Sequence, residues 1–136
     1  MKKIFIASYS LLIVGILATL CTKKKTSSWE TTYPASTRKI RFQLYTNQDF
    51  SGNTSLISFS LFIRNASKTI LDSSLTTMQI KDLPDAEHKL VIEKTVNDNS
   101  DVAAGFHYEI QNVGNSSYID TSKAGNLFKI IDFAFQ

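Results

Sequence analysis

The sequence predicts an all-β fold, a single antiparallel β-sandwich of about seven or eight short strands. Apolar and polar residues alternate over most of residues 38–136, which is the period of a strand with one buried face. Turn-forming residues separate these runs at intervals of roughly 8–12 residues. Beyond residue 37, no apolar stripe with helical spacing lasts longer than about ten residues. These three observations favour packed sheets over a helical domain.

The first two predicted strands have the clearest alternation. In RKIRFQLYT (38–46) and SLISFSLFIRN (55–65), every second residue is apolar and the intervening residues are mostly polar. The segment NQDFSGN between them has the composition of a turn. Tyr45 and Phe62 are aromatic residues on the polar faces, where each could stack on a sugar or a protein, or pack beneath another layer.

The later part of the chain is less uniform. KTILDSSL and TTMQIKDLP are short and irregular, KLVIEKTV and GFHYEIQNV alternate regularly, and SSYID predicts a short strand. The last run, NLFKIIDFAFQ, is apolar on nearly both faces. Such a run is typical of a strand in the centre of a sheet or between two layers.

Residues 38–136 are predicted to form one domain without internal repeats. The sandwich is expected to be immunoglobulin-like or transthyretin-like, because a lipocalin-like barrel usually needs a longer chain. The Cys and Trp hallmarks of true immunoglobulin domains are missing, since no Cys follows Cys21 and no Trp follows Trp29. A single cysteine allows no intramolecular disulfide, so the core alone must stabilise an exported domain.

The N-terminal segment has the layout of an export signal. Two lysines precede an apolar run from Ile4 to Leu20, which is a little shorter than the roughly 20 residues that a membrane-spanning helix needs. The segment LATLC that ends this run resembles the lipobox of bacterial lipoprotein signals, with Cys21 in the position that receives the lipid. The sequence therefore predicts a signal helix at residues 1–20 and lipid attachment at Cys21.

Two alternatives remain open for this segment. The run is followed by Lys23, Lys24 and Lys25, and the positive-inside rule would place the domain of an uncleaved inner-membrane anchor in the cytoplasm. The other alternative is a soluble secreted product. In each case residues 21–37 are predicted to be a flexible tether, because their Ser, Thr and Lys cannot bury enough apolar surface to offset the entropy of ordering.

The net charge of +3 does not indicate a nucleic-acid partner. Five of the 15 basic residues precede residue 38, which leaves 10 against 11 acidic residues in the predicted domain. A nearly neutral domain lacks the basic surface that nucleic-acid binding requires, so we expect no such partner.

The candidate binding residues lie in predicted loops, because sandwiches commonly bind ligands through their end loops. NQDFSGN contributes Asp49 and Phe50, NDNSD contributes Asn97, Asn99 and Asp101, and GNSS is a third candidate loop. The alternation in NDNSD is similar to the start of a calcium loop, but the Gly and the bidentate Glu that an EF-hand requires are missing. We expect a polar loop there, and neither a metal nor another cofactor.

An enzymatic alternative depends on two pairs of His and Glu. His107 and Glu109 share one face of a predicted strand, and Glu87 adjoins His88. Zinc requires three or four ligands, so the two pairs would have to meet. The chain also lacks a nucleophile elbow and a phosphate-binding glycine loop. We therefore expect no enzymatic activity.

Several segments of the domain carry a family resemblance. RFQLYTNQDFSG, DSSLTTMQIKDLP, KLVIEKTV and DTSKAG are similar to segments of small lipid-anchored β-sandwich proteins of Gram-negative bacteria. The resemblance implies no activity, and it transfers no site residue. It favours an exported protein anchored by its lipid in the cell envelope, at the outer membrane, with a protein or a glycan as its further partner.

The expected function is thus a non-enzymatic binding or structural module at a membrane. Two alternatives are kept. One is a small envelope hydrolase or metal-dependent enzyme that uses the His and Glu pairs. The other is an assembly subunit that pairs edge strands, which the apolar C-terminal segment FKIIDFAFQ suggests.

Overall fold

The computed structural model describes residues 37–136. The predicted signal at residues 1–20, the acylation site Cys21 and the tether as far as residue 36 lie outside the described residues. The described part contains the following elements: β1 (Arg38–Thr46), β2 (Leu56–Arg64), β3 (Thr69–Ser74), β4 (Met78–Gln79), the 3-10 turn η1 (Ile80–Asp82), β5 (Leu90–Val96), β6 (Val102–Ile110), β7 (Gly114–Ser122) and β8 (Phe128–Phe135).

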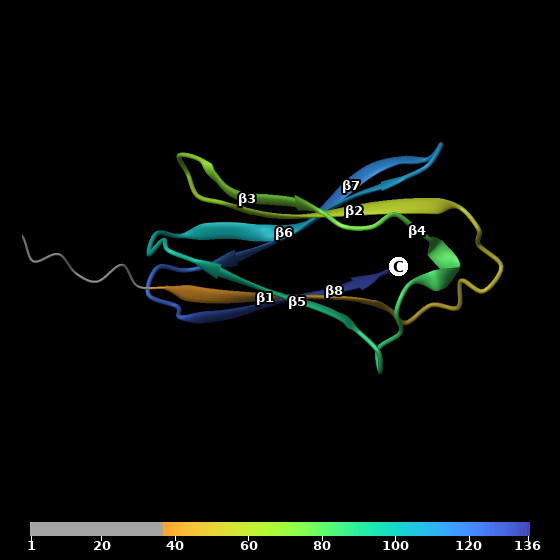
Figure 1. The fold of residues 1–136 in the computed structure, drawn as a ribbon, viewed down its shortest axis with the longest axis horizontal. Coiled ribbons are helices and arrows are strands. Elements are labelled where there is room, and N and C mark those ends of the chain that lie inside the picture. The colour runs from red at the N-terminus through yellow and green to blue at the C-terminus, as the bar shows by residue number, and fades with distance from the viewer. Residues whose placement is uncertain (1–36) are drawn as a thin grey trace, which may run out of the picture. The chain divides into compact units, whose positions relative to one another are not determined.

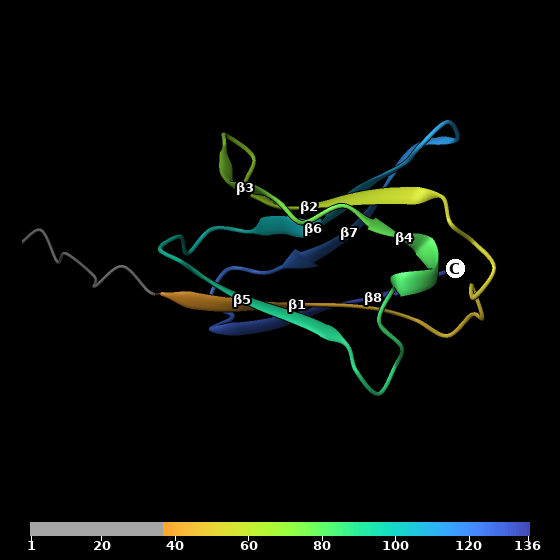
Figure 2. The ribbon, with the colours of Figure 1, turned by 45° about the vertical axis from the view of Figure 1, so that its right-hand side comes forward.

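These strands form two sheets that pack face to face, as Figures 1 and 2 show. The three-stranded sheet has the order β5-β1-β8, and the five-stranded sheet has the order β3-β2-β6-β7 with β4 also paired to β2. All strand pairs are antiparallel except β1 and β8, which run parallel. The predicted all-β sandwich is confirmed, and the parallel pair corrects the expectation of a purely antiparallel fold.

The strands are divided between the sheets without regard to chain order, because β1, β5 and β8 lie in one sheet and β2, β3, β4, β6 and β7 lie in the other. The chain therefore crosses between the sheets after β1, after η1, after β5 and after β7. The last strand β8 lies beside the first strand β1. Because β8 reaches this place from β7 in the opposite sheet, it enters at the end where β1 begins and runs parallel to it (Figure 1).

The core lies between the two sheets and uses the faces that the alternation predicts. Each fully buried side chain of this kind contributes about 1.5–3 kcal/mol to stability. Edge-to-face aromatic contacts, such as Phe42 on Phe106 at 5.6 Å between ring centroids, join the layers. The residues that β1 and β2 contribute to this core are Ile40, Phe42, Leu44, Ile57, Phe59, Leu61 and Ile63.

Two predicted elements differ from the structure. The short strand expected at SSYID is part of the nine-residue β7, because Gly114–Ser122 pairs with β6 along its whole length. The C-terminal run is an edge strand instead of a central one. Its inward residues pack in the core, but Phe128 and Ile130 on its outer face remain 47% and 41% exposed. Its apolar composition on both faces therefore does not reflect burial on both faces.

Arg38 is the largest fully buried side chain, with 1% of its surface exposed. Its guanidinium donates hydrogen bonds to the carbonyl oxygens of Asp98, Ser100 and Ser122 at 2.9, 2.6 and 3.3 Å. A buried charge is tolerated when its donors are satisfied in this way. Arg38 thereby joins the start of β1 to the β5–β6 and β7–β8 loops.

Candidate binding groove

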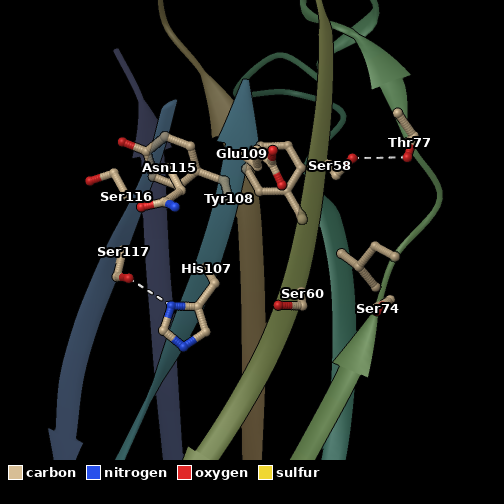
Figure 3. Close-up of a pocket in the computed structure, with 12 residues that line it drawn as sticks. Ser58, Ser60, Ser74, Thr77, His107, Tyr108, Glu109, Asn115, Ser116 and Ser117 are labelled. Atoms are coloured by element: carbon tan, nitrogen blue, oxygen red, sulfur yellow. Dashed lines mark hydrogen bonds between the residues drawn. The ribbon is translucent and has the colours of Figure 1, made fainter. Parts of the chain in front are cut away.

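An open groove of about 640 Å³ lies on the outer face of the five-stranded sheet (Figure 3). Its floor is made by β2 and β6, and its sides by the start of β7 and by the segment that follows β3. Its lining residues are Ser58, Phe59, Ser60, Ser74, Leu75, Thr77, His107, Tyr108, Glu109, Asn115, Ser116 and Ser117.

One side of the groove exists because the edge of the sheet is interrupted. β3 pairs with β2 up to Ser74 opposite Ser60, and β4 resumes the pairing with Met78 opposite Ile57. The three residues 75–77 therefore lie opposite only two residues of β2. The extra residue makes this segment bulge away from the sheet. The bulge is fixed by the Leu75 amide, which donates to the Phe59 carbonyl at 2.8 Å.

The floor is hollow because its outward side chains are short. Ser58 and Ser60 occupy the outward positions of β2 beside Glu109 and His107 of β6. The Ser58 hydroxyl lies 3.0 Å from that of Thr77 on the bulge. Serine side chains cannot fill the space that Lys, Arg or an aromatic ring would occupy, so hydroxyl groups line an open surface.

His107 is held in place from two directions. Its Nδ1 lies 2.6 Å from the Ser117 hydroxyl of β7, and its ring stacks on Phe62 of β2 with centroids 4.3 Å apart and planes 21° apart. Within residues 37–136 no side chain bonds the second ring nitrogen. A fixed imidazole of this kind presents one hydrogen-bonding nitrogen and one ring face to a ligand.

The charge of the groove comes from a single carboxylate. Glu109 is its only acidic lining residue, and no Lys or Arg lines it. The remaining polar groups are hydroxyls, the imidazole and the Asn115 carboxamide. The groove can therefore accept and donate many neutral hydrogen bonds, but it offers no cation for a phosphate or a carboxylate.

The two outward aromatics behave as packing residues. Phe62 is only 3% exposed because the His107 ring covers one side and the Arg64 guanidinium lies 5.4 Å from the ring centroid. Tyr45, on the outer face of the other sheet, lies beneath Lys89 with the ammonium 3.8 Å from its ring centroid. Both rings are thus packed against neighbouring side chains, which is the second of the two alternatives that the sequence left open.

The predicted loop residues Asp49 and Phe50 have local roles. The Asp49 carboxylate accepts the Ser51 amide at 3.0 Å, a bond that lowers the pKa of Asp49. Phe50 packs on Phe135 with ring centroids 5.6 Å apart, so it covers the end of the core. Neither residue lines the groove.

The NDNSD loop lies at the opposite end of the sandwich from Asp49, so the two loops form no common site. Asn99 accepts the Gly125 amide and Asp101 accepts the Ala124 amide, at 3.0 and 2.8 Å. Lys123 donates to Asp101 and is the main cause of its lowered pKa. Asn99 and Asp101 thus bind the β7–β8 loop, whereas the Asn97 side chain forms no hydrogen bond within residues 37–136.

The two His and Glu pairs do not meet. His88 contacts Asp85 in the loop before β5, with 2.9 Å between Nδ1 and Oδ1, whereas His107 lies on the outer face of β6. In the described part of the chain, no group of three or more His, Cys, Asp or Glu is arranged to hold a metal ion. The candidate GNSS loop is strand instead, and it supplies Asn115, Ser116 and Ser117 to the groove.

Most groove residues were not identified from the sequence, although their signal was present. Ser58 and Ser60 on β2 and Ser74 on β3 are small polar residues at outward positions, and such positions more often carry long side chains. They form one surface with residues of β6 and β7 because these four strands are neighbours in the sheet, and no single segment of the sequence encodes that strand order.

Comparison with known proteins adds no assignment: no family model, no curated protein and no solved structure matches the chain. Within residues 37–136, no helix has the length and apolar character needed to cross a bilayer. The fold and the groove geometry are therefore the basis for the functional argument.

Proposed function

We propose that the protein is a non-enzymatic binding module of the cell envelope, anchored by lipid at Cys21, whose groove binds a neutral glycan. The observation that carries this proposal is the groove of about 640 Å³ lined by hydroxyl, carboxamide and imidazole groups with no cation. A glycan presents alternating hydroxyl donors and acceptors, which these groups match. An anionic ligand would leave Glu109 facing a like charge.

The shape of the groove indicates which part of a glycan it can bind. Because the groove is open along the sheet, it suits the internal units of an oligosaccharide more than a single sugar that must be enclosed. Each bond from a neutral hydroxyl contributes little after desolvation, about 0.5–1.5 kcal/mol, whereas a bond to the Glu109 carboxylate contributes about 1.5–3 kcal/mol. We expect dissociation constants between about 1 μM and 1 mM, as befits a shallow polar surface.

The lack of catalytic machinery supports a binding role. The Ser117 and His107 side chains adjoin, but no carboxylate bonds the second imidazole nitrogen in the described residues, and a hydrolytic serine needs such an orienting group. The His88 and Glu87 pair lies in a separate loop. This arrangement supports the proposal of binding without turnover.

The anchoring half of the proposal rests on the N-terminal sequence. The apolar run that ends in LATLC predicts acylation of Cys21, and outer-membrane location is part of the proposal. The test is the intact mass of protein purified from its native membranes beside a Cys21→Ala form. We expect a chain that starts at Cys21 with added acyl mass, and a full-length unacylated chain would instead establish the uncleaved anchor.

The groove is tested by calorimetric titration of the purified full chain with neutral oligosaccharides, such as chito- and cello-oligosaccharides. Glu109→Ala should weaken binding about tenfold or more, since it removes a charge-assisted bond. Glu93→Ala, which removes an exposed carboxylate from the opposite sheet, is the matched control and should change nothing. The absence of saturable binding to the whole set, or equal effects of the two variants, would overturn the glycan proposal.

The edge-strand alternative has one observation in its favour and one against it. β8 is an edge strand, so its outer side is free to pair within the described part of the chain. However, Lys129 of β8 and Asp120 of β7 form a 2.6 Å ion pair between the two edges. Inward-pointing charges of this kind discourage strand addition, so the groove is the better-supported site.

A further inference from the structure

The two ends of the sandwich differ in charge. The end where β1 begins comprises residues 37–39 and the loops 65–68, 97–101 and 123–127, and it carries four basic side chains against two carboxylates. The opposite end, with loops 47–55, 80–89 and 111–113, carries four carboxylates against two lysines. The domain is therefore nearly neutral overall but positive where the preceding chain joins it.

The positive end also exposes an apolar pair. Leu127 and Phe128, at the start of β8, are 64% and 47% exposed. They lie directly beside the start of β1, because the Lys39 amide donates to the Leu127 carbonyl at 2.9 Å and Lys39 is the register partner of Phe128. The Arg41 guanidinium lies 5.2 Å from the Phe128 ring centroid. Arg41 also pairs with Glu93 at 2.6 Å, so Lys39 is the cation without an ion-pair partner beside this apolar pair in the described residues. Exposed apolar side chains next to cations are typical of a surface that rests in a lipid headgroup layer.

The carboxylates at this end do not cancel the effect. Asp101 is paired with Lys123 at 2.8 Å, and Asp98 accepts hydrogen bonds from Asn65 and Ser100. Lys39 and Lys68 are exposed and belong to no ion pair of the described residues. This end therefore carries three exposed lysines against two carboxylates, with Lys39 beside Phe128, Lys68 on the β2–β3 turn and Lys123 on the β7–β8 loop.

We propose that this end of the sandwich docks on an anionic lipid surface through Leu127 and Phe128, with Lys39 and Lys68 contacting lipid headgroups. This inference rests on the proposed membrane anchor. The chain of about 16 residues between Cys21 and Arg38 can extend no farther than about 55 Å, so an anchored domain stays near the bilayer. At such an effective concentration, a weak contact suffices for docking. Docking at this end would hold the β3–β2–β6–β7 face, and with it the groove, beside the membrane and open to solvent.

The test uses the full chain on vesicles with and without phosphatidylglycerol in phosphatidylcholine. Flotation reports anchoring, and quenching by headgroup-labelled lipid of a fluorophore at Asn126→Cys reports docking. A second fluorophore position, Val113→Cys, marks the opposite end, where Val113 is 76% exposed. Chain without either new cysteine is labelled in parallel, so that any signal from Cys21 is subtracted.

We expect quenching at position 126, little at position 113, and weaker quenching at position 126 on vesicles that lack the anionic lipid. Leu127→Ser or Phe128→Ser should each lower the docked-to-undocked ratio about tenfold, and Lys39→Glu should lower it by a similar factor. Val113→Ser and Lys81→Glu, matched changes at the opposite end, should leave it unchanged.

Three results would overturn the inference. If the chain floats but shows equal quenching or none at the two positions, the anchor proposal stands and the docking proposal fails. If the chain does not float, the anchor proposal and the docking proposal both fail. If quenching is equal on vesicles with and without anionic lipid, the basic side chains do not contribute to docking and the proposal of an anionic lipid surface fails.

Discussion

The outer faces of the two sheets differ in the length of their side chains and in how these side chains pair. On the three-stranded sheet, long side chains satisfy one another: Arg41 donates two hydrogen bonds to Glu93, and Lys89 bonds Asp132 at 3.1 Å. On the five-stranded sheet, the corresponding positions of β2 and β6 carry serines, His107 and Glu109. The first face carries ion pairs between long side chains, while the second is hollowed and leaves its short polar side chains open to solvent.

The comparison teaches that side-chain length, more than polarity, separates a solvated face from a candidate site. The outward residues of β1 and of β2 are mostly polar in sequence, and in both strands they alternate with buried apolar residues. What differs is how far each side chain reaches and whether its neighbour on the next strand has the opposite charge. Changes that move the strands or fill the hollow should therefore affect the two faces unequally.

The largest expected effect comes from Gly105, which sets how closely β7 approaches β6. A Cβ on Gly105 would lie 1.8 Å from the carbonyl oxygen of Tyr118, so Gly105→Ala forces the main chain of β7 to move. We expect a loss of about 3 kcal/mol or more in the free energy of unfolding, measured by urea denaturation. Gly52→Ala is the control, because nothing lies within 4 Å of its added Cβ. Equal stability of the two variants would contradict the close approach.

The next effect concerns the aromatic residue on each outer face. Phe62→Ala removes a ring that is 3% exposed and supports His107, and we expect it to cost about 2–3 kcal/mol. Tyr45→Ala removes a half-buried ring from the outer face of the three-stranded sheet and should cost about 1 kcal/mol. Denaturant titration of both variants measures the difference. A smaller loss for Phe62→Ala than for Tyr45→Ala would show that the His107 stack does not shield Phe62 in solution.

Acid should weaken the contact between the two sheets at their shared edge. The hydrogen bond from Lys129 is the main reason that the pKa of Asp120 is lowered. Around and below pH 4, near the carboxyl pKa of unfolded chains, the unfolded state binds more protons than the folded state, so stability falls as pH falls through the folded pKa. The pair is partly exposed, so we expect its contribution to be about 0.5–1 kcal/mol at pH 7 and lost at low pH.

The measurement is the free energy of unfolding of Asp120→Asn and of the unchanged chain at pH 7 and near pH 3. Asp98 and Asp101 also have lowered pKa values, so the unchanged chain loses stability in acid for several reasons. The variant should lose less than the unchanged chain between the two pH values. Equal losses would mean that the ion pair does not form in solution.

The fold could be predicted from the sequence because its strongest signals are local. Alternation in β1, β2, β5 and β6 identified the buried faces, since a strand alternates whatever its neighbours are. The edge position of β8 and its parallel pairing with β1 could not be predicted, because both depend on contacts between distant segments. The buried state of Arg38 was missed for the same reason: its partners lie in two loops at least 60 residues away.

The candidate site was harder to predict than the fold. The sequence predicts that His107 and Glu109 share one face, but it connects them to a site only in the alternative where they meet Glu87 and His88, and the structure does not assemble that cluster. The bulge at residues 75–77 and the Ser117 contact with His107 depend on strand register, which a single sequence does not reveal. The candidate groove thus depends on cross-strand pairing, whereas the core depends on local alternation.

The smallest expected effect tests whether the outer face of the three-stranded sheet is stabilised by its ion pairs or only covered by them. Arg41 and Glu93 are opposite each other on β1 and β5, with 2.6 Å between Nη2 and Oε1, but their side chains are 38% and 44% exposed. A double-mutant cycle with Arg41→Ala and Glu93→Ala should give a coupling free energy of about 0.3–0.5 kcal/mol that declines with added salt. A coupling well above 1 kcal/mol that is insensitive to salt would contradict this. Such a coupling would mean that the Arg41–Glu93 pair stabilises the contact between β5 and β1. The long side chains of this face would then do more than cover a surface that, on the other sheet, the short serines leave open.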